Sequence, residues 1–374
     1  IPMLSTAGRF GEIRGLLRRA FQTTVAVSLG LLAFWLVCWA LLPGAFSRPL
    51  WISGGIALAA LPCFALLHTR YGALRAQHRA VAGQLPIFVL QPLLAIALAA
   101  LALAVAPAAI DGIAAQLLFA ASIAAVCLLS FTALHRVGNG AWGAAPAAYA
   151  TRDWLAGAAP MMMASGFNIL IAQSGVLLLG AQLGEEAAGL YQPAAQLAGF
   201  VAIGLQITNQ PLAPKISQLT AEGRRPELQS LIFRVTSVCI AIAAALAGAL
   251  LLFAPQLLSV YGSEFAAAAP ALIVLALGQV ANVVCGPSAL ILTMTGHSRT
   301  VVKLMALGAA ICIALTLALS PALGILGAAI GSAAAVAVWN LGATWAARRK
   351  TGLFSTVLLR PLLHPRSSQE SRLA

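Results

Sequence analysis

The sequence predicts an all-α polytopic membrane protein with about ten transmembrane helices in two parallel-repeat bundles. Composition is the first reason. The 374-residue chain is 61% hydrophobic and 8% charged, with a mean hydropathy of +0.94, whereas about 25% of the residues in soluble domains are charged. The other two reasons are a series of long uncharged runs and an alternation of basic loops along the chain.

Ten uncharged apolar runs are long enough to cross the hydrocarbon core of a bilayer, which needs roughly 20 helical residues. Only helices or closed barrels satisfy their backbone hydrogen bonds in lipid, and continuous runs of this length favour helices over alternating barrel strands. The expected spans are 21–42, 50–68, 84–106, 113–134, 155–181, 189–211, 235–254, 267–293, 303–320 and 324–346.

The basic residues follow the expected spans. When the 22 Lys and Arg are sorted by loop, 21 fall in one set of alternate loops, and the other set holds Arg48 alone. That second set also carries Asp111, Glu185, Glu186 and Glu264. This is the positive-inside pattern, so both termini are expected in the cytoplasm. The net charge of +13 is therefore a topology signal that suits a lipid surface, and nucleic acid is not an expected partner.

The residue types that carry chemistry do not form a catalytic or metal-binding pattern. All six cysteines lie inside expected spans without CxxC pairing, which is typical of small apolar packing residues. The five histidines lie in expected cytoplasmic loops or at span ends. No acid falls in the interior of a span. We therefore expect neither an enzyme nor a bound metal or cofactor.

Two stretches far apart in the chain share a pattern. "TAGRFGEIRGLLRRA" at 6–20 aligns at a constant offset with "AEGRRPELQSLIFRV" at 221–235. Each is followed by a span, a short outer loop, a second span and a basic turn, in which Arg79 matches Arg299. Because the halves keep the same order and sidedness, they are expected to be parallel repeats with a site between them.

The repeat divides the chain into four parts. These are an N-terminal bundle of four helices (1–134), a cytoplasmic linker (135–154), a C-terminal bundle of six helices (155–346) and a cytoplasmic tail (347–374). Two spans precede the matched loop in the second half and none precede it in the first. Two leading helices are therefore expected to be missing, so that a complete form would have six plus six.

The span 189–211 carries a stripe of amides. Gln192, Gln196, Gln206 and Gln210 fall on one face of an ideal helix, together with Gly199 and Ile203. Because an unpartnered amide is costly in lipid, this face should meet water or other helices. The candidate lumen-lining residues are Gln192, Gln196, Gln206, Asn209, Gln210, Asn168, Gln279 and Asn282. Hydrogen bonding between helices is the alternative interpretation.

Residues 183–234, "LGEEAAGLYQPAAQLAGFVAIGLQITNQPLAPKISQLTAEGRRPELQSLIFR", resemble the seventh-to-eighth helix region of bacterial polysaccharide and oligosaccharide-lipid flippases. These belong to the multidrug/oligosaccharidyl-lipid/polysaccharide exporter superfamily. Gly-Leu-Tyr at 189–191 and Pro-x-x-x-x-L…Gly-x-x-x-E-L at 214–228 carry most of the resemblance. It implies two six-helix bundles that face each other around a central lumen. It also implies that alternating access of this lumen moves a lipid-linked glycan from the inner to the outer leaflet of the bacterial cytoplasmic membrane. Glycan polymerase or assembly proteins would be further partners.

Cations at the expected cytoplasmic helix ends suit this substrate class. A polyprenyl-diphosphate has an anionic head, which guanidinium groups bind in bidentate geometry. The candidates that recur in both halves are Arg19 with Arg234 and Arg79 with Arg299. The alternative is that these residues only obey the positive-inside pattern.

Two other functions stay open. A drug or metabolite exporter of the same superfamily, driven by sodium or protons, should carry a carboxylate inside a first-half helix, and the four spans present carry none. The third reading is a non-transporting membrane subunit of a glycan-assembly complex, which a genuine ten-span chain would favour.

Overall fold

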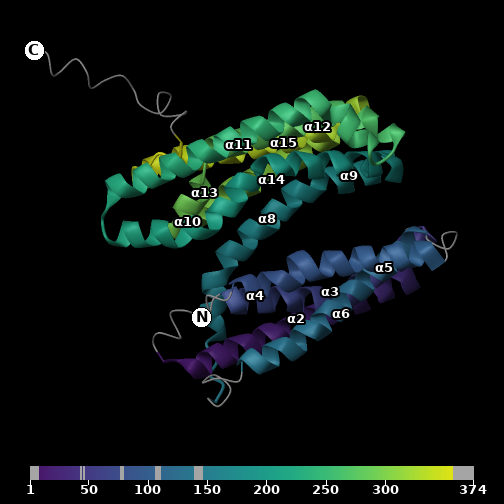
Figure 1. Ribbon diagram of the computed structural model, residues 1–374, viewed down its shortest axis with the longest axis horizontal. Coiled ribbons are helices and arrows are strands. Elements are labelled where there is room, and N and C mark those ends of the chain that lie inside the picture. Colours follow the sequence, from purple (N-terminus) through teal and green to yellow (C-terminus); the bar gives the residue numbers. More distant parts are fainter. Residues whose placement is uncertain are drawn as a thin grey trace, which may run out of the picture. The chain divides into compact units, whose positions relative to one another are not determined.

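The computed structural model describes residues 8–42, 44, 47–75, 80–105, 111–138 and 146–356, and within these ranges the chain is helical, without strands (Figure 1). It forms two compact units, residues 1–155 and 156–374. The helical fold class predicted from composition and hydropathy is confirmed.

Unit 1 is a bundle in which α3 packs against both α2 and α6, and α5 packs against α6. A small apolar core that includes Leu67, Ile123 and Val126 joins α3 to α6. Gln116 Nε2 on α6 also donates a 2.8 Å hydrogen bond to the Ser53 carbonyl on α3. The described elements are α2 (Phe10–Leu41), α3 (Arg48–Arg75), α4 (Ala80–Leu85), η1 (Pro86–Leu90), α5 (Gln91–Val105) and α6 (Gly112–Gly138).

Unit 2 is a larger bundle in which α15 packs along both α12 and α14, and α11 packs against α12 and α10. Two apolar clusters fill it, one centred on α9, α11 and α12 and the other on α11, α14 and α15. Its elements are α8 (Thr151–Leu183), α9 (Glu185–Gly199), η3 (Phe200–Ala202), α10 (Ile203–Ala221), α11 (Arg225–Ser259), η4 (Ser263–Ala268), α12 (Ala269–Cys285), α13 (Ser288–Met294), α14 (Ser298–Leu323) and α15 (Ile325–Thr351).

Nine helical segments in the described ranges are long and apolar enough to span a membrane, one fewer than the ten predicted runs. The difference is the run 189–211. An uninterrupted helix was expected there, and this is wrong: α9 ends at Gly199, the 3-10 turn η3 follows, and α10 continues with Pro211 and Pro214 inside it. The run 267–293 is also split, because Gly286, at φ +64°, and Pro287 end α12 before the short helix α13.

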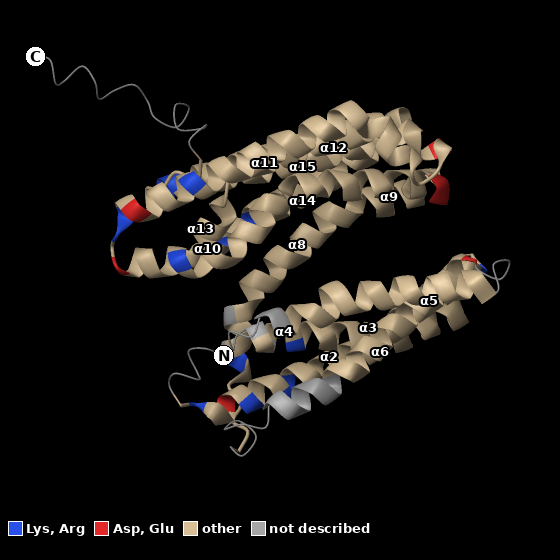
Figure 2. Cartoon of the chain, in the orientation of Figure 1, with Lys and Arg blue, Asp and Glu red and all other residues tan. Residues whose placement is uncertain are grey.

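Charged residues gather at the ends of the helices of unit 2 (Figure 2). The turn between α10 and α11 and the last turn of α15 carry Lys and Arg, including Arg348, Arg349 and Lys350. Glu185 and Glu264 lie in the first turns of α9 and η4, at the opposite end. The structure thus places the two sets of loops of this unit, basic and acidic, at opposite ends of the bundle.

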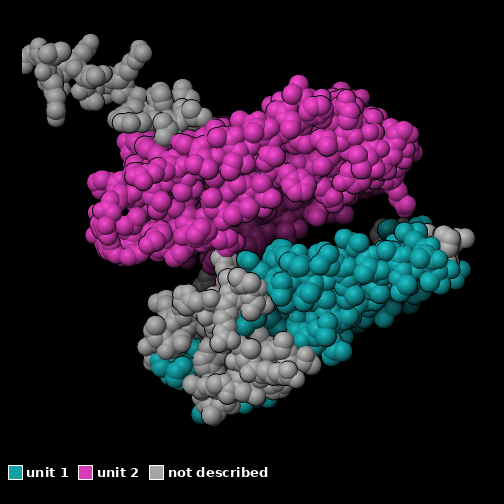
Figure 3. Space-filling view, in the orientation of Figure 1, with its two compact units in different colours: residues 1–155 teal, residues 156–374 magenta. Residues whose placement is uncertain are grey.

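Helices extend into the segments predicted as linker and tail. Residues 135–138 continue α6 and residues 151–154 begin α8, so the predicted linker 135–154 is helical at both ends, while 139–145 lie outside the described residues. Residues 347–351 belong to α15 in unit 2, the unit drawn in magenta in Figure 3. Residues 352–356 lie against α11, where Gln229 exchanges hydrogen bonds of 2.7 and 2.9 Å with the backbone of Phe354.

Candidate functional site

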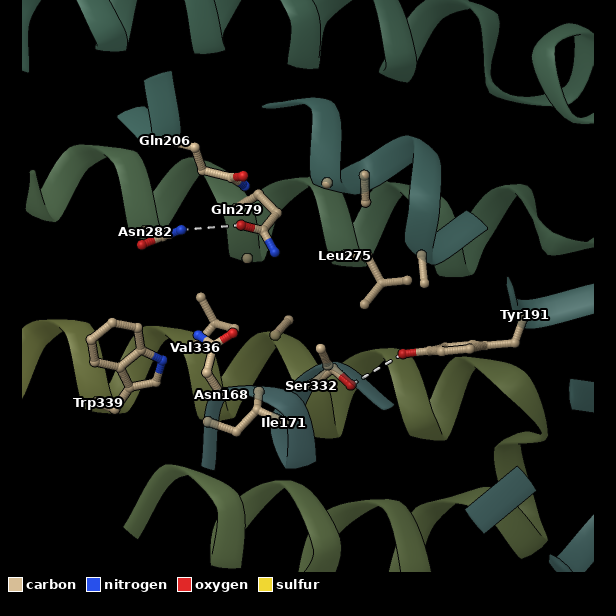
Figure 4. A pocket seen from close by; sticks show the side chains of 16 residues that line it. Asn168, Ile171, Tyr191, Gln206, Leu275, Gln279, Asn282, Ser332, Val336 and Trp339 are labelled. Carbon is tan, nitrogen blue, oxygen red and sulfur yellow. Dashed lines mark hydrogen bonds between the residues drawn. The ribbon is translucent and has the colours of Figure 1, made fainter. Parts of the chain in front are cut away.

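Unit 2 contains a cavity of about 280 Å³ whose polar lining is uncharged. Side chains from α8, α9, α10, α12 and α15 converge on it (Figure 4). Among the described residues, the lining includes no Asp, Glu, Lys, Arg or His. Its polar members are Asn168, Tyr191, Gln206, Gln279, Asn282 and Ser332. The cavity, which we call the amide cavity, therefore offers hydrogen-bonding groups without a net charge.

Helix α12 supplies one wall of the amide cavity. Leu275, Gly278, Gln279 and Asn282 are spaced so that they share one helical face. Asn282 Nδ2 donates a 3.2 Å hydrogen bond to Gln279 Oε1 (Figure 4). Neither amide bonds to any other described residue, so the Gln279 amide nitrogen and the Asn282 oxygen remain free to meet a ligand.

The opposite wall comes from α15, and Gly278 sets its distance from α12. A Cβ atom at Gly278 would lie 2.9 Å from the Cα atom of Ala333, which is too close for a side chain of any size. The glycine therefore lets the two helices approach closely and brings Ser332, Val336 and Trp339 to the cavity.

Tyr191 connects α9 to this wall. Its ring is 1% exposed, and its hydroxyl lies 3.1 Å from Ser332 Oγ (Figure 4). Space for the ring exists because α8 carries Gly175, where a Cβ atom would lie 2.7 Å from the tyrosine. Farther inside, Cys312 Sγ lies 3.0 Å from Ser174 Oγ and 3.7 Å from Ser332 Oγ. Polar contacts thus join α8, α9, α14 and α15 behind the cavity.

The predicted amides divide into two groups. Asn168, Gln206, Gln279 and Asn282 line the amide cavity, whereas Gln192, Gln196, Asn209 and Gln210 do not. The stripe was predicted for one continuous helix, and the 3-10 turn η3 interrupts it. Such a turn, with three residues per turn rather than 3.6, shifts the two segments by a fraction of a turn, and Gly199 before it and Gln206 after it still line the same cavity.

The predicted amides outside the cavity are of two kinds. Gln196 and Gln210 are exposed on the surface of unit 2 and make no hydrogen bond to the described residues. Gln192 and Asn209 are half-buried, and the Asn209 Oδ1 atom is buried without a hydrogen-bond partner in the described structure. Because lipid offers no hydrogen-bond partner, these exposed amides need water or another polar surface.

The four predicted phosphate-binding arginines occupy different surroundings. Arg234 lines a second cavity, of about 340 Å³, between α10 and α11, with Lys215, Arg224 and Glu227 among its other lining residues. Its Nη2 atom donates a 3.2 Å hydrogen bond to Ser230 Oγ.

The other three arginines lie elsewhere. Arg299 is exposed in the first turn of α14, and no ion pair involves it in the described structure. Arg19, in unit 1, lies over the ring of Tyr149 at 5.3 Å. Arg79 lies outside the described residues.

Two ion pairs offset part of the charge in this second cavity. Arg224 Nη1 lies 2.8 Å from Glu222 Oε2, and Arg224 Nη2 lies 2.6 Å from Glu227 Oε2. The hydrogen bond from Arg224, aided by one from Gln218, lowers the pKa of Glu222 below its usual value. The two carboxylates in turn raise the pKa of Arg224. Lys215 and Arg234 remain as cations without an ion pair in the described structure.

Among the polar and aromatic residues of the amide cavity, sequence reasoning missed three: Tyr191, Ser332 and Trp339. Tyr191 was noted only as part of the Gly-Leu-Tyr pattern, and Trp339 looks like any core aromatic residue. A usable signal existed on α15, because Ser332 and Trp339 stand seven residues apart and so share a helical face.

The sequence matches no protein-family model and no curated protein. Its fold is nevertheless similar to that of solved membrane transporters. An inward-facing multidrug resistance MATE family transporter of the MOP superfamily is 14% identical, with a TM-score of 0.77 over 94% of this chain and 83% of that one. A MATE transporter from Vibrio cholerae is 17% identical, with a TM-score of 0.69 over 94% and 82%. A MOP superfamily transporter from Pyrococcus furiosus, described as having a binding pocket of reversed polarity, is 13% identical, with a TM-score of 0.64 over 90% and 77%.

Proposed function

We propose that this chain is a membrane transporter that moves a lipid-linked oligosaccharide, a polyprenyl-diphosphate glycan, from the inner to the outer leaflet by alternating access. Surface polysaccharide biosynthesis would be the process it serves. The fold shared with MATE and MOP superfamily transporters supports the transport function. The uncharged polar lining of the amide cavity is the observation that carries the proposed substrate class.

Sugars are neutral and carry many hydroxyl groups, each able to donate and accept a hydrogen bond. The side-chain amides of Asn168, Gln206, Gln279 and Asn282 offer both donors and acceptors. Trp339 adds an aromatic surface on which the apolar face of a sugar ring can pack. A few convergent polar groups in a largely apolar cavity are typical of small-molecule sites.

The diphosphate of such a substrate needs cations outside the amide cavity. Lys215 and Arg234 line the second cavity, at the end of unit 2 that the charge pattern predicts to be cytoplasmic. A guanidinium group binds phosphate oxygens in bidentate geometry, and an ammonium group binds them as a point charge. In this proposal the diphosphate binds Lys215 and Arg234 while the sugars bind in the amide cavity.

A sodium- or proton-coupled drug exporter is the second candidate, and the fold similarity to a multidrug resistance MATE transporter favours it. Ionisable residues inside spans usually carry such coupling. The ten predicted spans contain no Asp or Glu, so the coupling carboxylate would have to lie elsewhere. A non-transporting subunit of a glycan-assembly complex would show neither activity.

Reconstituted vesicles distinguish these functions. The chain is incorporated into liposomes with a fluorescent polyprenyl-diphosphate oligosaccharide, and a membrane-impermeant glycosidase reports the glycan fraction in the outer leaflet. We expect transfer by the unchanged protein, a strong loss in Gln279→Leu/Asn282→Leu, and little change in Gln173→Leu, an exposed α8 amide outside the cavity. Ion-driven uptake of a cationic dye without glycan transfer would support the exporter instead.

A further inference from the structure

We propose that a third cavity, at the basic end of unit 2, is a binding site for a phosphate group. It measures about 190 Å³ and lies where the α10–α11 turn, the turn before α14 and the end of α15 meet. It shares no lining residue with the amide cavity or the second cavity. Its ligand-facing groups are Thr220, Arg225, Thr295, His297, Lys350 and Thr351.

The charge of this phosphate cavity, as we call it, is uncompensated. Arg225 and Lys350 line it, and no carboxylate does among the described residues. The two nearby acids along the chain, Glu222 and Glu227, are both held by Arg224 at 2.8 and 2.6 Å. Arg225 and Lys350 form no ion pair in the described structure. Two cations therefore meet in a recess without a counter-ion, which favours an anionic ligand.

Donors from four parts of the chain converge on the recess. Arg225, at the first position of α11, provides its guanidinium group. Lys350 Nζ donates one 2.7 Å hydrogen bond to Thr300 Oγ1 and keeps two further N–H groups. His297 Nδ1 lies 3.3 Å from Thr295 Oγ1, which leaves Nε2 for a ligand. The Thr220 hydroxyl, on α10, has no hydrogen bond to the described residues and can donate as well.

The floor of the phosphate cavity is apolar and well packed. Leu228 is 1% exposed and Leu353 is 6% exposed, so the cavity has a fixed base rather than an open surface. The backbone N–H of Leu353 donates a 3.2 Å hydrogen bond to Thr351 Oγ1, which holds the residues after α15 in place.

The internal repeat shows that Arg225 is not part of the helix start that both halves share. Arg9 occupies the position that matches Arg224, and both pair with a glutamate three residues later. The next position is Phe10 in the first half and Arg225 in the second. The fold of this turn therefore does not require a cation at the second position, and Arg225 is available for binding.

A phosphate group fits the size and charge of these donors, since guanidinium and ammonium groups bind its oxygens with strong charge-assisted hydrogen bonds. Two sources share this chemistry: the headgroup of an anionic lipid, which the predicted cytoplasmic end would meet in the inner leaflet, and a soluble phosphate. This site is additional to the proposed transport of a glycan and does not depend on it.

The test measures binding to the 374-residue chain purified in a neutral detergent. Dioctanoyl phosphatidylglycerol and sodium phosphate are titrated separately, and the shift of the unfolding midpoint gives each dissociation constant. Arg225→Gln/Lys350→Gln removes two charges from the cavity. Lys303→Gln/Arg349→Gln removes two charges from the same end of unit 2 but outside the cavity. Arg225→Lys/Lys350→Arg keeps the charge.

We expect Arg225→Gln/Lys350→Gln to weaken binding by about tenfold or more, as for loss of hydrogen bonds to a charged group. The control pair should stay within about twofold, and the charge-keeping pair should bind better than the glutamine pair. If the double variant does not fold, each single glutamine variant should weaken binding by at least about threefold. If only the lipid binds, the ligand is a lipid headgroup. If sodium phosphate also binds, and the glutamine pair weakens its binding as much as that of the lipid, the site also takes a soluble phosphate. Equal weakening by the cavity and control pairs, or no binding of either probe, would overturn the proposal.

Discussion

Arg9 and Arg224 have nearly the same backbone conformation although they lie in different halves of the chain. Their dihedral angles are φ −83°, ψ 56° and φ −82°, ψ 59°, and each is the residue immediately before a long helix, α2 or α11. Each follows a glycine of positive φ, Gly8 or Gly223. Each also donates through Nε to a glutamate three residues later, at 2.7 and 2.9 Å. The repeated sequence therefore folds into a repeated helix start.

The glycine before each of these helices should be required for its backbone conformation. Gly223 has φ +71°, so Gly223→Ala forces an L-residue into the left-handed region, at a cost of about 1–2 kcal/mol. Gly248→Ala is the control, since this glycine lies inside α11 with open space around its Cβ position, and alanine there should stabilise the helix by about 0.5–1 kcal/mol. Unfolding of both variants in detergent measures the difference. Equal stability of the two would contradict the proposed role of the glycine.

The hydrogen bond between Tyr191 and Ser332 should be measurable as a coupling energy. Both partners are buried, so losing this 3.1 Å bond should cost about 0.5–1.5 kcal/mol. The double-mutant cycle of Tyr191→Phe, Ser332→Ala and both together isolates the pair. Tyr261→Phe, at an exposed tyrosine, serves as a control and should change little. Additive effects of the two single variants would show that the bond contributes no coupling.

The width of the amide cavity should depend on Gly278. In Gly278→Ala the new methyl group would meet Ala333 at 2.9 Å, so α12 and α15 must separate. We expect a loss of about 1–3 kcal/mol of stability from overpacking, together with slower glycan transfer. Gly189→Ala introduces the same methyl group on α9 where nothing lies within 4 Å, and it should leave both properties nearly unchanged. Unfolding midpoints and the vesicle assay test this, and a normal Gly278→Ala variant would refute it.

The α10–α11 turn should respond to acid. The pKa of Glu222 is lowered by its hydrogen bond to Arg224, so in the folded protein this carboxylate holds its charge to a lower pH than in the unfolded chain. Its stabilising contribution is complete above the ordinary glutamate pKa and disappears as the pH falls through the lowered value. In Arg224→Gln the pKa of Glu222 should rise. Carboxyl chemical shifts measured against pH in labelled protein report this change, and an unchanged pKa would show that Arg224 is not its cause.

The helices of this chain are largely predictable because lipid imposes a local requirement. Each apolar run in lipid must form its backbone hydrogen bonds within itself, as a helix. Hydropathy alone therefore locates the nine described helices that are long and apolar enough to cross a membrane. The caps at Arg9 and Arg224 were also predictable, because the repeated residues carry the same glycine, arginine and glutamate. These features depend on neighbours in the sequence.

The interrupted helix and half of the candidate site were not predictable in this way. The turn η3 changes the register of the amide stripe, and nothing in residues 200–202 marks it, since Phe, Val and Ala all suit a continuous helix. Tyr191 reaches Ser332 where Gly175 leaves room for the tyrosine ring, and Gly278 lets α12 approach α15 at Ala333. Such approaches depend on contacts between distant parts of the chain, which a single sequence does not reveal.

The most direct test of the proposed function is made in cells of the source organism that lack this gene. Lipid-linked oligosaccharides are extracted, quantified by mass spectrometry and assigned to a leaflet with an impermeant probe. The proposal predicts that a complete repeat unit accumulates on the cytoplasmic side, that the surface polymer is lost, and that the unchanged gene restores it while Gln279→Leu/Asn282→Leu does not. An unchanged lipid-linked pool with intact surface polymer would contradict the proposal.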